Sequence, residues 1–172
     1  MDPRPPADTA PTTSPMTYRE PTEADHARVL AVLDEWWGGL GGDEGARQRA
    51  GLLPRLFFQH FTDTSIVVER DGRLVAFLIG FLSQSRQDEA YIHFVGVDPA
   101  LHGRGLGSEL YHRFFDTMRR NGRTVVRAIT SDANTGSRAF HARMGFTEAR
   151  QIFPDYDGPG ATRVTFVRAL EP

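Results

Sequence analysis

Residues 97–110 read VDPALHGRGLGSEL and join an apolar, strand-like run to a helical pattern, with glycines at the alternate positions Gly103, Gly105 and Gly107. Glycine allows the backbone to adopt positive φ angles and to approach a ligand closely. The first amides of a helix have no acceptor within the helix, and the helix dipole adds partial positive charge at that end. The segment therefore predicts a turn between a strand and a helix that binds phosphate through its backbone.

An ordinary glycine-rich connection is the alternative, and it would be the better interpretation of two glycines alone. The dinucleotide-binding pattern G-x-G-x-x-G does not fit, because its last position falls on Ser108 in one frame and on Leu110 in the other. A hairpin precedes the glycines, whereas a dinucleotide site follows the first strand of a parallel unit. The turn therefore predicts a phosphate site of another kind.

Gly96 lies inside the strand-like pattern HFVGV, seven residues before the glycine turn. A glycine within a strand is typical of a bulge or of a close backbone approach. A bulged strand exposes N–H and C=O groups that its neighbour no longer pairs, and an extended ligand could bind those groups. Together with the turn, Gly96 predicts a long ligand with a pyrophosphate at one end and a peptide-like arm at the other.

Hydrophobic periodicity predicts one mixed sheet of class α/β or α+β, because antiparallel hairpins come first and a strand-helix-strand-helix section follows. The expected strands are 16–21, a hairpin over 64–85 with its turn at 71–72, 89–99, 124–132, 146–153 and 162–170. The expected helices are 22–37 with a capping box at Thr22 and Asp25, 46–61 interrupted at Pro54, 105–120 and 134–144. Five of the first fifteen residues are proline, so we expect a disordered leader over 1–16 and a single domain over 17–172.

Composition excludes several classes of site. The 20 basic residues are all Arg, they face 22 acidic residues, and the net charge of −2 gives no footprint for nucleic acid. The absence of Lys and Cys excludes a Walker lysine, a Schiff base, disulfides, thiolate metal sites and a cysteine nucleophile.

His26, His60 and His112 lie on helical patterns, where a surface or structural role is expected, and no two histidines have the spacing of a helical metal pair. No apolar run reaches the roughly 18 residues of a membrane span, and without a secretory signal we expect a cytoplasmic protein.

Two segments resemble the GNAT superfamily of acetyl-CoA-dependent N-acetyltransferases. The family's acyl-CoA motif, Q/R-x-x-G-x-G/A, is similar to HGRGLG at residues 102–107, which matches at Gly105 and Gly107 and departs from the motif at His102. A later family segment is similar to NTGSRAFHARMGF at residues 134–146, where His141 stands in place of a frequent tyrosine. The matching positions of this second segment are Asn134, Phe140, Gly145 and Phe146.

The resemblance covers residues 17–170 in element order and implies a GNAT-like, mostly antiparallel mixed sheet with a splayed central strand flanked by helices. It implies acetyl-CoA as co-substrate, no metal, a small-molecule amine as partner and, at the level of the family, a homodimer. It also implies that the coenzyme contacts Val95, Gly96, Val97, His102, Gly103, Arg104, Gly105, Leu106, Gly107, Ser108, Asn134, Ser137, Phe140 and His141.

The implied reaction is direct attack of a neutral amine on a thioester, which needs a proton acceptor, a donor for the oxyanion and a proton for the departing thiolate. Strand alternation predicts that Tyr91, His93, Val95 and Val97 share one face, on the strand that often carries the base in GNAT enzymes. His93 is the first candidate base, because its ordinary pKa is about 6.5. Tyr91 could orient substrate or relay a proton, and the alternative for His93 is a packed polar neighbour.

His141 is implied to lie near the coenzyme sulfur, where it would protonate the thiolate, or would merely pack beside the pantetheine. A backbone N–H within residues 95–97 is the expected oxyanion donor. Three classes of function stay open: acetylation of a small amine or amino-acid-like molecule, acetylation of a protein terminus or lysine, and non-catalytic binding of acyl-CoA.

Two further groups have a structural and a functional interpretation. Trp36 and Trp37 could be core residues or could wall an acceptor pocket. Asp155, Tyr156 and Asp157 could belong to an ordinary hairpin loop or could help to hold a cationic amine.

Overall fold

A computed structural model describes residues 14–37 and 42–171 of the chain. Most of the expected leader lies outside the described residues. The elements are β1 (Thr17–Arg19), α1 (Asp25–Trp36), α2 (Gly42–Leu52), α3 (Phe57–His60), β2 (Ile66–Arg70), β3 (Arg73–Leu82), β4 (Glu89–Val97), α4 (Leu106–Arg120), β5 (Val125–Ser131), α5 (Thr135–Arg143), β6 (Thr147–Phe153) and β7 (Arg163–Ala169), with short 3-10 turns at Thr62–Thr64 and Pro99–Leu101. The helix expected over 46–61 is a pair, α2 and α3, that separates around Pro54.

The strands form one sheet in the order β1-β2-β3-β4-β5-β7-β6. Every neighbouring pair is antiparallel except β4 and β5, which are parallel. The helices cover both faces: α4 packs on the face that contributes Ala76 and Leu78, whereas α1 and α3 pack on the face that contributes Phe77 and Ile79. The predicted mixed, mostly antiparallel sheet flanked by helices is confirmed.

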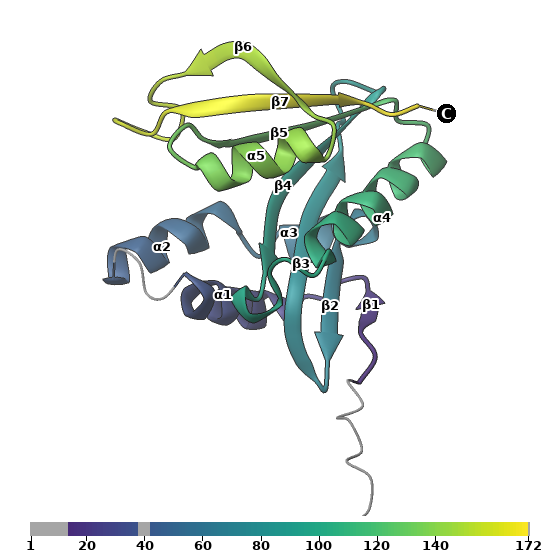
Figure 1. The fold of residues 1–172 in the computed structure, drawn as a ribbon. Coiled ribbons are helices and arrows are strands. Elements are labelled where there is room, and N and C mark those ends of the chain that lie inside the picture. The colour runs from purple at the N-terminus through teal and green to yellow at the C-terminus, as the bar shows by residue number, and fades with distance from the viewer. Residues whose placement is uncertain (1–13, 38–41, 172) are drawn as a thin grey trace, which may run out of the picture.

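The pairing between β4 and β5 covers the start of β4 and then stops. The register runs from Glu89 opposite Val125 to Tyr91 opposite Arg127. Beyond that last pair the two strands separate, and β5 continues with β7 while β4 continues along β3 (Figure 1). The predicted splayed central strand is therefore confirmed, and residues 92–97 keep a strand edge that β5 does not cover.

A β-bulge interrupts β4 at His93. Ile79 of β3 pairs with Phe94, and the next residue, Gly80, pairs with Ile92, which leaves His93 as the extra residue of β4. A bulge places two residues of one strand opposite one residue of its partner, so the alternation of side chains changes phase there.

The predicted common face of Tyr91, His93, Val95 and Val97 is wrong for this reason. Tyr91 and His93 stack on phenylalanine rings on the face covered by α1 and α3. Val95 and Val97 pack into the core beneath α4 on the opposite face. The bulge thus separates the two candidate catalytic side chains from the valines of the same strand.

Gly96 is not the bulge itself. It pairs in regular register with Phe77. A Cβ added at Gly96 would lie 2.5 Å from the Phe77 ring and 3.1 Å from the Trp36 ring. The glycine therefore allows two aromatic rings to approach the backbone of β4, which is the close-approach interpretation.

The first turn of α1 is anchored by a buried carboxylate. Asp25 is 1% exposed and accepts hydrogen bonds from the Arg19 and Arg28 guanidinium groups at 2.7 and 2.8 Å and from the Thr22 amide at 2.8 Å. The bond from the Thr22 amide is one half of the expected capping box, whereas Ala24 is the N-cap residue and no side chain caps the helix. The arginine hydrogen bonds, led by Arg19, hold the pKa of Asp25 well below its usual range.

Candidate functional site

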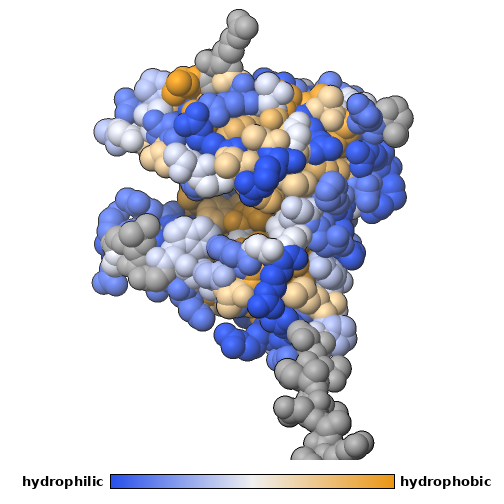
Figure 2. Space-filling model, viewed as in Figure 1, coloured by the Kyte–Doolittle hydropathy of each residue, from blue (hydrophilic) through white to orange (hydrophobic). Residues whose placement is uncertain are grey.

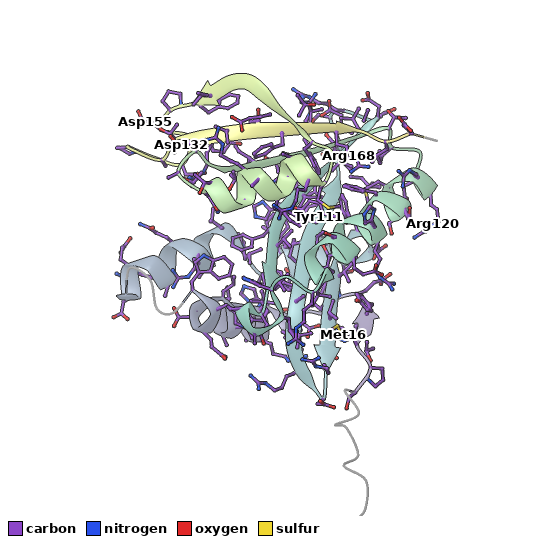
Figure 3. All side chains as sticks on the ribbon, viewed as in Figure 1. Met16, Tyr111, Arg120, Asp132, Asp155 and Arg168 are labelled. Atoms are coloured by element: carbon purple, nitrogen blue, oxygen red, sulfur yellow. The ribbon has the colours of Figure 1, made fainter. Side chains whose placement is uncertain are left out.

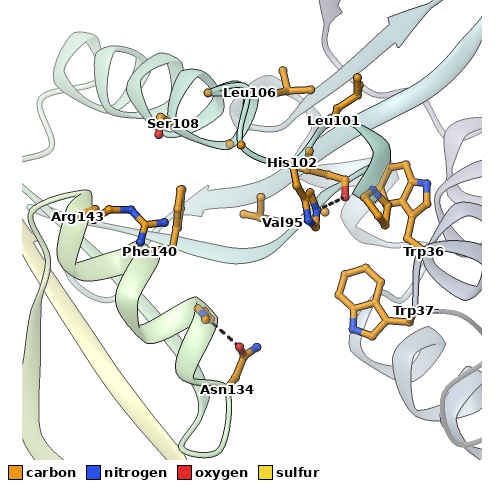
Figure 4. Close-up of a pocket in the computed structure, with 18 residues that line it drawn as sticks. Trp36, Trp37, Val95, Leu101, His102, Leu106, Ser108, Asn134, Phe140 and Arg143 are labelled. Atoms are coloured by element: carbon orange, nitrogen blue, oxygen red, sulfur yellow. Dashed lines mark hydrogen bonds between the residues drawn. The ribbon is translucent and has the colours of Figure 1, made fainter.

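A cavity of about 660 Å³ lies where β4 parts from β5. Figure 2 shows a hollow with hydrophobic residues inside it between the two halves of the molecule. The residues that line the cavity come from the end of α1, from β4, from the glycine turn and from α5: Trp36, Trp37, Val95, Gly96, Val97, Pro99, Leu101, His102, Gly103, Gly105, Leu106, Gly107, Ser108, Asn134, Gly136, Ser137, Phe140 and Arg143. This cavity is called the groove below (Figure 4).

The glycine turn has the geometry of an anion site. Gly103 and Gly105 have φ angles of 75° and 82°, in the left-handed region that favours glycine. Gly105 is the N-cap of α4, and the amide of Glu109 makes the first bond back to its carbonyl at 2.9 Å. The amides of the preceding residues of α4 have no acceptor within the helix. A Cβ added at Gly103 or Gly105 would meet nothing within 4 Å, so the space beside the turn is open.

Side-chain hydrogen bonds hold both ends of the groove in place. The His102 ring nitrogen Nε2 lies 3.0 Å from the Val97 carbonyl, which ties the turn to the end of β4. The Asn134 side chain accepts a hydrogen bond from the Ser137 amide at 3.0 Å and caps α5. Both residues therefore shape the groove through their contacts with its backbone.

The groove brings together all but two of the residues predicted to contact coenzyme. Arg104 and His141 do not line it. Gly136 and Arg143, which were not predicted, line the groove from α5. Their positions four residues before and three residues after Phe140 give the signal that could have found them, because residues at this spacing share one face of a helix.

His141 lies beneath the groove, with 5% of its surface exposed. Its ring nitrogen Nδ1 is 2.8 Å from the Ser137 carbonyl, and its Nε2 is 3.2 Å from the Tyr111 hydroxyl. A carbonyl can only accept, so Nδ1 carries the proton and Nε2 accepts from Tyr111, which extends from α4 (Figure 3). The ring also stacks on Phe166 at 4.4 Å. Burial lowers the pKa of His141 and favours this neutral form.

Tyr91 and His93 lie on the other face of the sheet. The His93 ring stacks on Phe57 with 4.4 Å between ring centroids, and its Nε2 is hydrogen-bonded to the Leu52 carbonyl. Burial lowers the pKa of His93 and raises the pKa of Tyr91. Tyr91 and Tyr156 both line a second cavity, of about 320 Å³.

Two absences hold for the described residues, 14–37 and 42–171. No group of three or more His, Cys, Asp or Glu side chains is placed to hold a metal ion there. None of the helices in these ranges has the length and apolar character needed to cross a membrane.

Comparison with known proteins gives one matching family and several relatives. Residues 27–146 match the sequence profile described as the acetyltransferase (GNAT) family. An L-2,4-diaminobutyric acid acetyltransferase of Nocardia farcinica is 32% identical over 114 residues, which cover 60% of this chain and 59% of that relative. The chain thus spans less than two thirds of the length of this curated relative.

Solved structures share the fold over most of the chain. The ribosomal-protein-S18-alanine N-acetyltransferase of Escherichia coli superposes with a TM-score of 0.68 at 18% identity, over 92% of this chain and 96% of that one. A Salmonella typhimurium protein whose structure contains its cofactor acetyl-CoA superposes with a TM-score of 0.66 at 21% identity, over 91% of this chain and 94% of that one. At these identities the similarity establishes a common fold.

Proposed function

Because the chain belongs to the acetyltransferase (GNAT) family, we propose that it transfers an acetyl group from acetyl-CoA to the primary amine of a small, amino-acid-like molecule. The observation that carries the proposal is the groove, in which the free edge of β4, the glycine turn and α5 line a single cavity. The relative named as a diaminobutyric acid acetyltransferase supports a small, amino-acid-like acceptor.

The groove fits the two chemically different parts of the coenzyme. The amides at the start of α4 and the positive-φ glycines would hold the pyrophosphate, since the space beside the turn is open. The uncovered edge at residues 95–97 would pair with the amide groups of the pantetheine arm. When bound, the coenzyme supplies an acyl carbon activated as a thioester.

The reaction requires two proton transfers and the stabilisation of one developing negative charge. As the C–N bond forms and the C–S bond breaks, the amine loses a proton, the acyl oxygen gains negative charge, and the released thiolate takes up a proton. A backbone N–H of residues 95–97 is our candidate donor to that oxygen.

His93 is our candidate for the group that accepts the amine proton. Its Nε2 must donate to the Leu52 carbonyl, which leaves Nδ1 unprotonated and basic. The lowered pKa keeps the ring in the neutral form that a base needs at pH 7. The acid role of His141 stays a prediction, since both of its ring nitrogens are already bonded within the fold.

The test is a thiol-release assay with acetyl-CoA and three acceptor panels: small amino acids that carry a second amine, simple diamines, and peptides with a free terminus or lysine. We expect acceptor-dependent thiol release with at least one small acceptor and none above background with peptides. Turnover with peptides alone would replace the proposal with protein acetylation. Coenzyme binding in calorimetry without release on any panel would make the chain a non-catalytic acyl-CoA-binding module.

A further inference from the structure

The second cavity, of about 320 Å³, lies on the face of the sheet opposite α4 and α5. Val126 and Ala128 point into the core beneath α4, so strand alternation places Arg127 and Ile129 on the other face. The lining residues are Arg86, Tyr91, Arg127, Ala128, Ile129, Ala149, Phe153, Tyr156, Thr165 and Phe166. We call this space the arginine cavity.

The wall of the arginine cavity combines positively charged side chains with aromatic rings. Among the described residues that line it, the charged ones are Arg86 and Arg127, and none carries a carboxylate. The rest of the wall includes the aromatic rings of Tyr91, Phe153 and Tyr156. This combination suits a ligand with an apolar body and an anionic end.

The carboxylate of Glu89, whose side chain is 12% exposed, fixes the Arg127 side chain in position. The Arg127 Nε and Nη2 groups donate hydrogen bonds to Glu89 at 2.7 and 2.8 Å. Within the described residues the remaining Nη1 group has no hydrogen-bond partner. Arg86, whose side chain is 63% exposed, lies 3.4 Å from the same carboxylate. A preorganised guanidinium with a free N–H edge, and a second guanidinium beside it, is a good receptor for a ligand carboxylate.

The arginine cavity lies beside the point at which β4 and β5 separate. Tyr91 opposite Arg127 is the last residue pair before β4 and β5 separate. No strand pairing beyond that point closes the sheet between the arginine cavity and the groove. His93, at the bulge, is two residues farther along β4, which corresponds to about 7 Å along a strand.

We propose that the arginine cavity binds the carboxylate end of the acceptor, which is an amino acid whose reacting amine lies several bonds away from that carboxylate. This inference rests on the proposed function and adds the acceptor's chemical class to it. The carboxylate lies against Arg127 and Arg86, and the aliphatic body lies between the aromatic rings. The distal amine then reaches the bulge, whereas an α-amine, held next to its carboxylate, stays in the arginine cavity.

The experiment compares two acceptors that differ by the carboxylate alone, L-2,4-diaminobutyrate and 1,3-diaminopropane. We expect the wild-type chain to use diaminobutyrate with a kcat/KM at least tenfold higher. Equal kcat/KM values for the two acceptors would overturn the inference while leaving the proposed acetyltransferase function intact. Absence of thiol release with these and all other amines would instead refute the proposed function.

Variants of Arg127 and Arg86 test whether these two arginines cause the preference for diaminobutyrate over diaminopropane. Because Arg127→Gln alone would leave Glu89 with only the more distant Arg86 as a partner, the main variant is Glu89→Gln/Arg127→Gln, and the second is the exposed Arg86→Gln. Both should raise KM for diaminobutyrate, the double variant at least tenfold, and should change kcat/KM for diaminopropane less than threefold. Arg73→Gln, a control on the exposed hairpin with a 76% exposed side chain, should match wild type. Retention of the full preference by both cavity variants would overturn the inference.

Discussion

Gly107 is the position at which the groove can be tested without distorting the glycine turn. It lies in the first turn of α4 and has no positive φ angle, in contrast to Gly103 and Gly105. A Cβ at Gly107 would stand 3.5 Å from the Phe140 ring and 3.9 Å from the Val97 side chain, which are ordinary contacts. The two methyl groups of Gly107→Val would then extend into the space between α5 and β4, where the coenzyme is proposed to lie.

The expected loss follows from the bonds that the valine would displace. One hydrogen bond to a charged group contributes about 1.5–3 kcal/mol, so losing one amide–phosphate bond should raise the dissociation constant of acetyl-CoA by about 10- to 150-fold. Valine is a better helix former than glycine by a few tenths of a kcal/mol, so the melting temperature should not fall.

Isothermal titration calorimetry with acetyl-CoA, together with thermal unfolding, measures both quantities. The matched control is Gly51→Val, because Gly51 is also helical, is exposed, and has nothing within 4 Å of an added Cβ. An unchanged dissociation constant in a folded Gly107→Val variant would refute the assignment of the coenzyme to the groove.

Three further predictions concern individual side chains. Arg143→Ala should raise the dissociation constant of acetyl-CoA more than Arg104→Ala does in calorimetry, since Arg143 lines the groove and Arg104 does not; the reverse order would contradict the geometry. His141→Phe should lower the free energy of unfolding at pH 7.5 by about 1–3 kcal/mol, because it leaves the Tyr111 hydroxyl without its partner. Burial lowers the pKa of His141 in the folded state below its unfolded value of about 6.5. As pH falls below that value, the free energy of unfolding of the wild type should therefore decrease by up to about 1.4 kcal/mol per pH unit. Urea titrations at pH 7.5 and 5.5 should show a smaller decrease in His141→Phe. Turnover reduced by about 10²-fold in His141→Phe would support the acid role, whereas near-wild-type turnover would support packing alone. Asp25→Asn should lower the free energy of unfolding by about 1.5–3 kcal/mol in the same titrations, since it weakens the hydrogen bonds from two arginines that keep Glu69 as a second partner, and an unchanged free energy of unfolding would contradict the anchoring role.

The local features of the site could be predicted from the sequence. The turn with Gly103, Gly105 and Gly107 is encoded within a few residues, because positive φ angles and free helix amides depend on local sequence. Ser137 and Phe140, three residues apart, likewise lie on one side of α5, and that side lines the groove. The hydrophobic pattern likewise predicted where the strands lie along the chain, because apolar residues gather wherever a strand is buried, on one face or, as in β3, on both.

Features set by pairing between distant strands could not be predicted. The bulge at His93 depends on how β4 pairs with Ile79 and Gly80 of β3. The residue pattern of β4 alone does not show which of its residues has no partner on β3. The shift of phase at the bulge then reversed the expected face for Val95. The burial of His141 depends in the same way on contacts from α4 and β7, far away in the sequence.

The separation of β4 from β5 has a consequence for amide hydrogen exchange. Successive N–H groups along a strand point to opposite sides, so within residues 92–97 some amides face β3 and the others face the side that β5 has left. In the free protein, slowly and rapidly exchanging amides should therefore alternate along this segment, with the phase changing at the bulge. A coenzyme that pairs with the open edge should slow the rapid set selectively. The same strand would then carry two kinetic classes of amides, one governed by global unfolding and one by ligand occupancy.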